Sequence, residues 1–228
     1  MASDKKGAQR LGAHIVFVDE SGFQLTPSVR KTWGPQGQTP VMRHWQRRDK
    51  VSAVSALSVS PNLRRIGLYW RLHIKNIQQP EVCEFLRHLL RHLRGHVVVI
   101  WDNSKTHAGE PVREMCRRFP RLHLERLPPY APELNPDEGV WDHLKDALAN
   151  GRPDDLTDII EDLLDGLYEL HTCQPTLRSC VHRSDLPPYF ALTVALLIQR
   201  SVVTVTNLRK LVTVTNATSL RLVGCCWH

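Results

Sequence analysis

One apolar run that ends abruptly in polar residues constrains the fold more than any other feature of the sequence. Residues 97–101 read Val-Val-Val-Ile-Trp, and Asp102 and Asn103 follow at once. An unbroken stretch of this kind is typical of a strand that is buried on both faces of a sheet. Ligands of open α/β sheets gather where such strands end. We therefore expect Asp102 to lie at a functional edge of the sheet.

Composition indicates a cytoplasmic protein with a sizeable core. The chain has 228 residues, of which 42% are hydrophobic and 23% charged. No apolar run approaches the roughly 18 residues of a membrane helix, and we expect neither a signal peptide nor a membrane partner. The six cysteines are scattered, which favours reduced thiols. The His and Cys residues within 171–182 match no common zinc spacing, so we interpret them as incidental to a helix end.

Charge is distributed unevenly along the chain. Residues 1–100 contain 16 Lys and Arg against 6 Asp and Glu, whereas residues 101–228 contain 14 against 17. A basic half joined to an acidic half suits a polyanionic partner and a carboxylate-rich site. A merely solvated surface is the alternative.

The order of the predicted elements indicates an α/β fold with a ribonuclease H-like mixed sheet of about five strands, flanked by helices, over residues 14–190. Three antiparallel strands come first, followed by helices alternating with strands and by an extra helix. We interpret residues 1–13 as a basic leader. Residues 191–228 form an atypical tail, whose two Val-Thr-Val-Thr-Asn copies either pair as a hairpin or pack on nothing. The predicted strands cover 14–18, 51–59, 66–72, 97–101 and 122–127, and the helices 79–93, 110–119, 135–149 and 154–170.

Three acids stand at the ends of these elements. Asp19 follows the first strand and precedes an expected turn at Ser21–Gly22, Asp102 follows the fourth strand, and Glu138 lies in the first turn of the helix opened by Asn135. Converging carboxylates repel one another unless cations join them, and their hard oxygens favour Mg²⁺, with Mn²⁺ as a substitute. Two such ions would form the clamp used for in-line attack on a phosphodiester.

Each acid also has a structural explanation. Asp19 and Asp102 both suit turns or caps, and Glu138 occupies the third helical position of a capping box. Any one of them alone is a weak indication of a site. Three acids at matching element ends favour a shared site, with Asp19, Asp102 and Glu138 as both the catalytic residues and the metal ligands.

Four segments resemble the catalytic domain of mariner-type insertion-sequence transposases of the DDE class. The resemblance covers about residues 13–190, and its most specific part is the proline-rich approach to Leu-Asn-Pro-x-Glu. It implies cleavage of transposon ends and transfer of the 3′-hydroxyl strand into target DNA. It selects Glu138 over its rival Asp137 as the third acid. The segments are FVDESGF, TWGPQGQTP, VIWDNSKTHAG and LPPYAPELNPDEGVWDHLK.

Further residues gain expected roles from the same resemblance. Asn103 and His107 would orient the metal site or the scissile phosphate, although His107 equally suits a hydrogen bond that closes a loop. Trp33 is expected to contact DNA or a partner subunit, with a core anchor as the alternative. A basic cluster suits phosphate contacts, or else is a solvated loop. Its members are Arg43, Arg47, Arg48 and Lys50.

The sequence departs from the family at its start. Complete members carry helix-turn-helix domains before the catalytic domain, whereas this sequence reaches the first catalytic strand almost at once. We therefore expect that it lacks a DNA-binding domain of its own, that transposon-end and target DNA are its partners, and that it forms a homodimer. A separate helix-turn-helix polypeptide would complete it. The alternatives are an inactive or truncated fragment that only binds DNA or a partner, and a structure-selective nuclease of the same fold.

Overall fold

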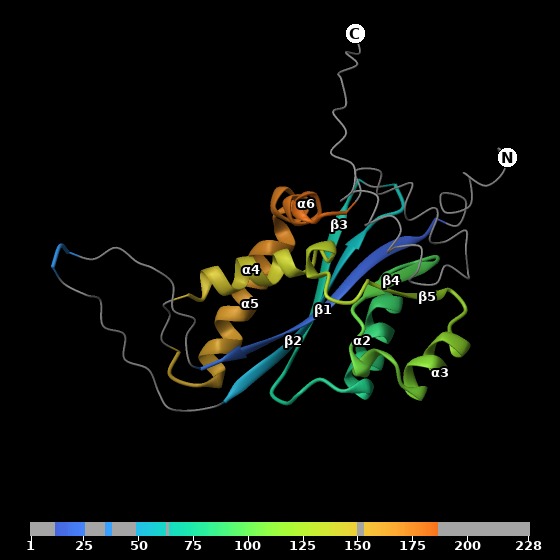
Figure 1. The fold of residues 1–228 in the computed structure, drawn as a ribbon, viewed down its shortest axis with the longest axis horizontal. Coiled ribbons are helices and arrows are strands. Elements are labelled where there is room, and N and C mark those ends of the chain that lie inside the picture. Colours follow the sequence, from blue (N-terminus) through green and yellow to red (C-terminus); the bar gives the residue numbers. More distant parts are fainter. Residues whose placement is uncertain (1–11, 26–34, 38–48, 63, 150–152, 187–228) are drawn as a thin grey trace, which may run out of the picture.

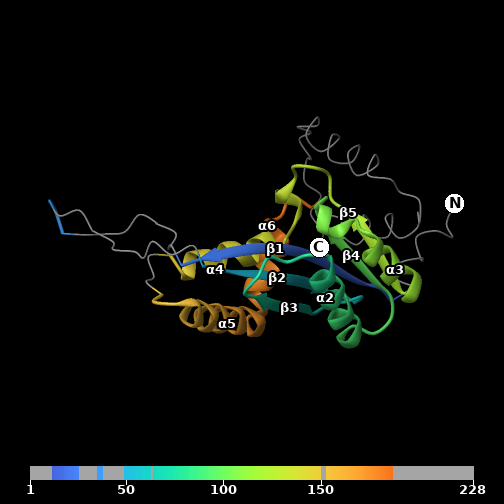
Figure 2. The same cartoon turned by 90° about the horizontal axis from the view of Figure 1, so that it is seen from below.

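A mixed sheet separates two layers of helices in the part of the chain that the structure describes. The structure is a computed structural model, and it describes residues 12–25, 35–37, 49–62, 64–149 and 153–186. The strand order across the sheet is β3-β2-β1-β4-β5. Figures 1 and 2 show the sheet between the two layers. The strands are β1 His14–Gln24, β2 Lys50–Val59, β3 Ile66–His73, β4 Val97–Trp101 and β5 Leu122–Arg126.

The pairing confirms the predicted ribonuclease H-like architecture. Strands β1, β2 and β3 form an antiparallel meander, while β4 runs parallel to both β1 and β5. A helix precedes β4 on the connection from β1, and another joins β4 to β5, as is usual between parallel strands. The helices are α2 Gln79–His92, α3 Glu110–Arg118, α4 Glu138–Ala147, α5 Leu156–Thr172 and α6 Gln174–Arg183, with short 3₁₀ turns η2 Lys105–His107 and η3 Pro132–Leu134.

The two faces of the sheet carry separate hydrophobic cores. Helices α2 and α3 cover one face, where Val16, Val18 and Trp101 are buried. Helices α4, α5 and α6 cover the other face, where Phe17 and Trp141 are buried. Successive residues of a strand point to opposite faces. Strand β1 therefore contributes alternate side chains to both cores, and this alternation decides the surroundings of Asp19 and Glu20.

The first strand is longer than its sequence predicts. The expected turn at Ser21–Gly22 is wrong, because β1 continues to Gln24 and Asp19 lies in mid-strand. The reason is the partner strand, since β2 pairs along the whole of β1 and matches Ser21 with Ala53. Hydrogen bonding to a neighbouring strand outweighs the local turn preference of these residues.

Two helical details also differ from the prediction. Helix α4 begins at Glu138 rather than at Asn135–Pro136, and Asn135 instead closes the turn η3. The Asn135 side chain still accepts a hydrogen bond from the backbone N–H of Asp137 at 3.2 Å, so it caps the turn that leads into α4. Helix α6 has no counterpart among the predicted elements.

Several expectations fall on residues that the structure does not describe. Trp33, Arg43, Arg47 and Arg48 lie outside the described residues, as do nearly all of the leader and the whole of the tail. The described cysteines, residues 83, 116, 173 and 180, are free thiols. Within the described ranges, no helix has both the length and the apolar character that a membrane span demands.

Candidate functional site

A pocket of about 480 Å³ lies where β4 ends, and the three predicted acids line it together. The acids come from three different elements: Asp19 from β1, Asp102 from the residue after β4, and Glu138 from the start of α4. The remaining wall is the proline-rich segment that links β5 to α4. It is formed by residues 127–132 together with Asn103, Ser104 and Asn135.

Asp19 lies on β1 just beyond the point where its neighbour β4 ends. The parallel register of β1 and β4 runs from His14–Val97 to Phe17–Ile100 and, continued for two residues, would place Asp19 opposite Asp102. Because β4 stops at Trp101, the side of β1 next to Asp19 faces the pocket instead of a neighbouring strand. On its other side Asp19 pairs with Ser55 of β2.

The surroundings of Asp19 disfavour its negative charge. Burial, followed by the nearby carboxylate of Glu138, raises the pKa of Asp19 to about 7, and Asp102 adds to this rise. Carboxylates that raise one another's pKa in this way form a site that a cation would stabilise.

Asp102 is exposed, and one of its oxygens is held by the protein. Its Oδ1 accepts a hydrogen bond from the backbone N–H of Ser104 at 2.9 Å, and the Nδ1 atom of His107 lies 2.8 Å from the same oxygen. The hydrogen bond from His107 holds the pKa of Asp102 below its usual value, against the effect of burial. Asp102 is therefore the acid of this site that carries its charge most readily.

His107 is buried between an indole ring and two carboxylates. Its ring is stacked on that of Trp101, with centroids 4.2 Å apart and planes 2° from parallel. Its Nε2 atom lies 3.1 Å from Oε1 of Glu20. Burial alone would lower the pKa of His107, but the hydrogen bonds to Asp102 and Glu20 outweigh it and raise the pKa to about 9.

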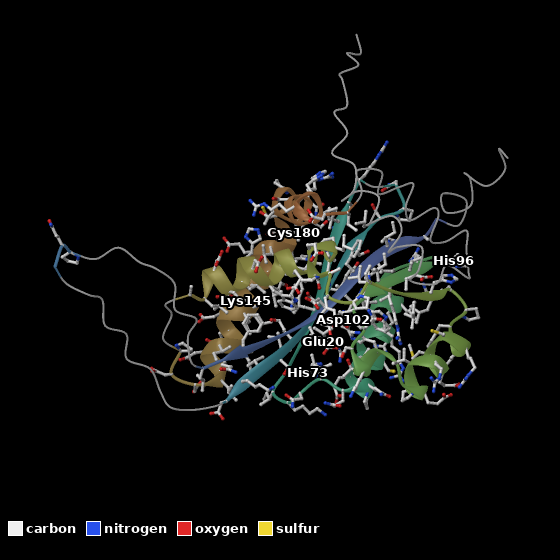
Figure 3. The ribbon with its side chains drawn as sticks, viewed as in Figure 1. Glu20, His73, His96, Asp102, Lys145 and Cys180 are labelled. Atoms are coloured by element: carbon white, nitrogen blue, oxygen red, sulfur yellow. The ribbon has the colours of Figure 1, made fainter. Side chains whose placement is uncertain are left out.

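Glu20 is the functional neighbour that sequence reasoning missed. Figure 3 labels Glu20 and Asp102, which lie near each other at the centre of the fold. The available signal was strand alternation: if Asp19 faces one layer, the next residue must face the other.

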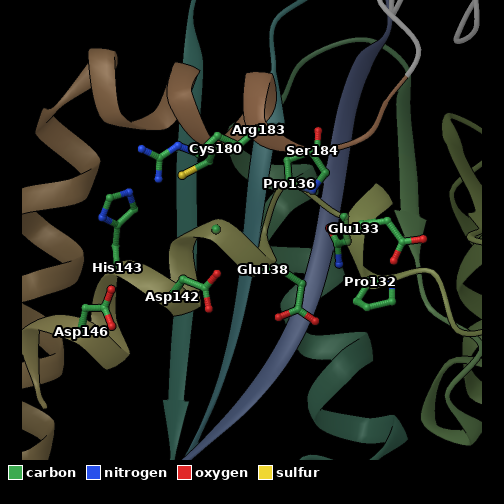
Figure 4. A pocket seen from close by; sticks show the side chains of 12 residues that line it. Pro132, Glu133, Pro136, Glu138, Asp142, His143, Asp146, Cys180, Arg183 and Ser184 are labelled. Carbon is green, nitrogen blue, oxygen red and sulfur yellow. The ribbon is translucent and has the colours of Figure 1, made fainter. Parts of the chain in front are cut away.

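Glu138 is half-buried at the first position of α4. Burial raises its pKa, Asp142 and Asp102 add to the rise, and Lys145 opposes it. Figure 4 shows the Glu138 and Asp142 side chains in a second pocket of about 200 Å³ between α4 and α6. Glu138 thus borders both pockets.

Asp137, the rival for the third acid, occupies a different environment. It is fully buried, and its Oδ2 accepts a hydrogen bond from the Ser55 hydroxyl at 2.6 Å. Burial raises its pKa well above the usual value despite that bond. Asp137 does not line the pocket that Asp19, Asp102 and Glu138 share.

The remaining predicted residues differ in how close they lie to the pocket. Asn103 lines it, and its side-chain amide donates a hydrogen bond to the carbonyl of Leu127 at 2.7 Å, which ties the end of β4 to the end of β5. Lys50 opens β2 opposite Gln24, five residues along β1 from Asp19, and does not line the pocket.

The three carboxylates are of the kind that binds a divalent cation, although in this structure they do not lie as close together as the ligands of one ion. Among the described residues, no three His, Cys, Asp or Glu side chains are grouped closely enough to hold a metal ion. Of the His and Cys residues within 171–182, His171 contacts the carbonyl of Leu68 through Nδ1 at 3.1 Å and Cys173 contacts the Thr176 hydroxyl at 3.0 Å. Asp19, Asp102 and Glu138 nevertheless share one pocket and repel one another there, and carboxylate oxygens are the ligands that Mg²⁺ and Mn²⁺ prefer.

Comparison with known families identifies the domain. Residues 14–160 match the model of the DDE superfamily endonucleases, which is well over half of the chain. The chain belongs to this family. A DDE relative, the transposable element Tc1 transposase of Caenorhabditis elegans, is 29% identical over 157 residues, covering 64% of this chain and 55% of Tc1.

A solved structure shares the fold of this DDE domain. A pre-cleavage Mos1 transpososome aligns with a TM-score of 0.51 at 17% identity, covering 78% of this chain and 60% of the Mos1 chain. This likeness confirms the expected fold, and the family match over residues 14–160 confirms the DDE class of the expected resemblance. The chain spans a little over half the length of the Tc1 and Mos1 proteins that it matches.

Proposed function

We propose that this DDE domain is a metal-dependent DNA transposase domain, which cleaves transposon ends and transfers the 3′-hydroxyl strand into target DNA. The observation that carries the proposal is the convergence of three carboxylates from three elements on one pocket, where burial and Glu138 raise the pKa of Asp19 to about 7. Such a cluster is unfavourable without a cation. Family membership supports the same chemistry.

In this proposal Asp19, Asp102 and Glu138 hold Mg²⁺ or Mn²⁺. When bound, a divalent ion stabilises the charge that develops on a phosphodiester and lowers the pKa of an attacking water or hydroxyl. The protein itself supplies the open pocket and the wall formed by residues 127–132. Asn103 holds that wall against the end of β4 through its bond to Leu127.

The proposed partners are transposon-end DNA and target DNA, and the proposed location is the compartment that contains this DNA. Trp33, Arg43, Arg47, Arg48 and Lys50 remain proposed DNA contacts. A homodimer and a separate helix-turn-helix polypeptide are further proposals. Both can be tested by measuring the mass of the complex formed on DNA.

The function is tested by cleavage of labelled duplexes taken from the DNA that flanks the coding sequence of the protein. We expect cleavage in Mn²⁺ that EDTA abolishes and that Asp102→Asn lowers by about 100-fold or more, the equivalent of roughly 2.7 kcal/mol of lost transition-state stabilisation. Glu84→Gln is the matched control, because Glu84 pairs with Arg71 away from the pocket.

Each alternative outcome has a distinct meaning. Cleavage that survives Asp102→Asn would overturn the assigned site. A folded protein that binds these duplexes without cutting them would instead be a DNA-binding fragment. Cleavage that depends on branched or mismatched structure, and not on the flanking sequence, would indicate a structure-selective nuclease.

A further inference from the structure

Two successive residues of β1 serve opposite sides of the candidate site. Asp19 lies on the face that α4 covers, and its charge is coupled to that of Glu138. Glu20 lies on the other face, where His107 contacts it and Trp101 is part of the core. The Glu20 carboxylate is linked to the site by its contact with His107.

His107 has little freedom to choose other partners. Its side chain is 3% exposed, and the parallel stack on Trp101 fixes the plane of the ring. Both ring nitrogens are engaged: Nε2 lies 3.1 Å from Oε1 of Glu20, and Nδ1 lies 2.8 Å from Oδ1 and 3.4 Å from the backbone carbonyl of Asp102. An imidazole without a free nitrogen cannot itself bind a metal ion. Its position suits a bridge between the two carboxylates.

The bridge acts on one particular oxygen of Asp102. Oδ1 lies 2.8 Å from Nδ1 of His107 and accepts the backbone N–H of Ser104 at 2.9 Å. Two donors use the two lone pairs that a carboxylate oxygen offers in its plane. Oδ2 is therefore the atom of Asp102 that remains for a ligand in the pocket.

We propose that Glu20 is a positioning residue which, through His107, fixes Oδ1 of Asp102 and so presents Oδ2 alone to a divalent cation. This inference rests on the proposed function, because it concerns how the same site holds its cation. Groups that hydrogen-bond to the ligands of a metal, as His107 does to Asp102, tune metal affinity, and losing one typically costs 10–100-fold.

The test is the affinity of the protein for Mn²⁺ alone, measured by the relaxation of water protons without DNA. We expect Glu20→Ala to weaken Mn²⁺ binding by about 10-fold or more. Glu20→Gln should recover most of the affinity, because its amide oxygen can still accept a hydrogen bond from Nε2. Glu84→Ala is the matched control and should bind Mn²⁺ like the original protein.

Thermal unfolding in EDTA separates positioning from damage to the fold. We expect Glu20→Ala to keep a cooperative transition, with a midpoint within a few degrees of the original, because the Glu20 side chain is 25% exposed and its loss leaves no large cavity. If the original protein binds Mn²⁺ and Glu20→Ala binds it equally well, the positioning role is overturned. If the original protein itself binds no Mn²⁺, it is the proposed function that fails.

A structure of the Mn²⁺ complex tests the atomic claim. Anomalous scattering from manganese should place the ion next to Oδ2 of Asp102, with Oδ1 still bound by His107 and Ser104. An ion bound through Oδ1, or through both oxygens, would overturn the inference even if Glu20→Ala weakened binding.

Discussion

Asp137 and Glu138 are adjacent residues of the same type in quite different environments. Asp137 is fully buried and accepts a hydrogen bond from Ser55, whereas Glu138 lines the pocket that it shares with Asp19 and Asp102. The sequence places two acids after Asn135-Pro136 and offers no local reason to prefer either, so only the family motif selected Glu138. The sequence alone could not show that Asp137 is the acid that is buried outside the pocket.

Substitution of these two acids should separate their roles. We expect Glu138→Gln to lower Mn²⁺-dependent cleavage by about 100-fold or more, because it removes a charged oxygen that faces the pocket. Asp137→Asn should stay within about 10-fold of the original, since its amide oxygen can still accept the Ser55 hydrogen bond. Equal losses in two folded variants would make Asp137 part of the site.

Glu125 on β5 provides a pH test that is independent of the proposed metal site. Burial raises its pKa from 4.5 to about 7. The folded state therefore binds a proton more readily than the unfolded state, and the resulting stability is present at low pH and is lost as the pH rises through about 7.

Removing that titration should flatten the pH profile of stability. At pH 8 we expect Glu125→Gln to be more stable by about 1 kcal/mol, a value reduced because solvent screens a half-buried group, whereas at pH 4.5 the two proteins should differ little. Thermal melts at both values measure this, with Glu161→Gln on the exposed side of α5 as control. A constant difference at both pH values would point to packing as its cause.

At the scale of elements, strand pairing decided what local sequence could not. The sequence predicts β2, β3 and β4 nearly to their ends, because apolar residues recur in each of them in the pattern of a strand. The continuation of β1 through Ser21–Gly22 was not, because it depends on β2 lying alongside. Helix α6 was missed for a similar reason, since only Leu177 and Cys180 of its ten residues are buried.

Helices α4 and α5 approach each other closely at Gly166, and this contact sets the position of the helix that carries Glu138. A Cβ atom at Gly166 would lie only 2.7 Å from Cδ2 of the buried Leu144. Any larger residue there must displace the buried Leu144 side chain or move the two helices apart.

Gly166→Val should therefore destabilise the protein. We expect a loss of about 1–3 kcal/mol from overpacking, which lowers the unfolding midpoint by about 2–4 °C for each kcal/mol in a chain of this size. Asp165→Val, at the neighbouring exposed position, controls for the low helix propensity of valine. Equal midpoints for the two variants would mean that the helices separate at no cost.

At the scale of the whole molecule, the candidate site lies at the seam between two cores. Strand β1 supplies both Asp19 and Glu20, His107 contacts Glu20 on the face where Trp101 is part of the core, and Glu138 begins α4 on the other face. The order of elements and the nature of the three acids could be predicted from sequence. Which site residues lie on which face of the sheet could not be predicted, because this depends on the face to which each β1 side chain points.

A cation bound at the seam should stabilise the whole domain. With Mn²⁺ at 100 times its dissociation constant, linkage adds about 2.7 kcal/mol to the free energy of unfolding, a rise of roughly 5–10 °C in the midpoint. EDTA should reverse the rise, and Asp102→Asn should reduce it. A rise that persists undiminished in Asp102→Asn would place the ion elsewhere.

The alternation of β1 also limits how this strand can evolve. Deleting or inserting a single residue before Asp19 would turn every later side chain to the opposite layer. After a deletion Glu20 would take the place of Asp19 and Asp19 that of Val18, and after an insertion Asp19 would take the place of Glu20. In either case both the proposed ligand and its bridge would be lost in one step. Point substitutions along β1 can be selected one by one, but a one-residue change in its length would have to be reversed by a second change within β1 that restores the alternation.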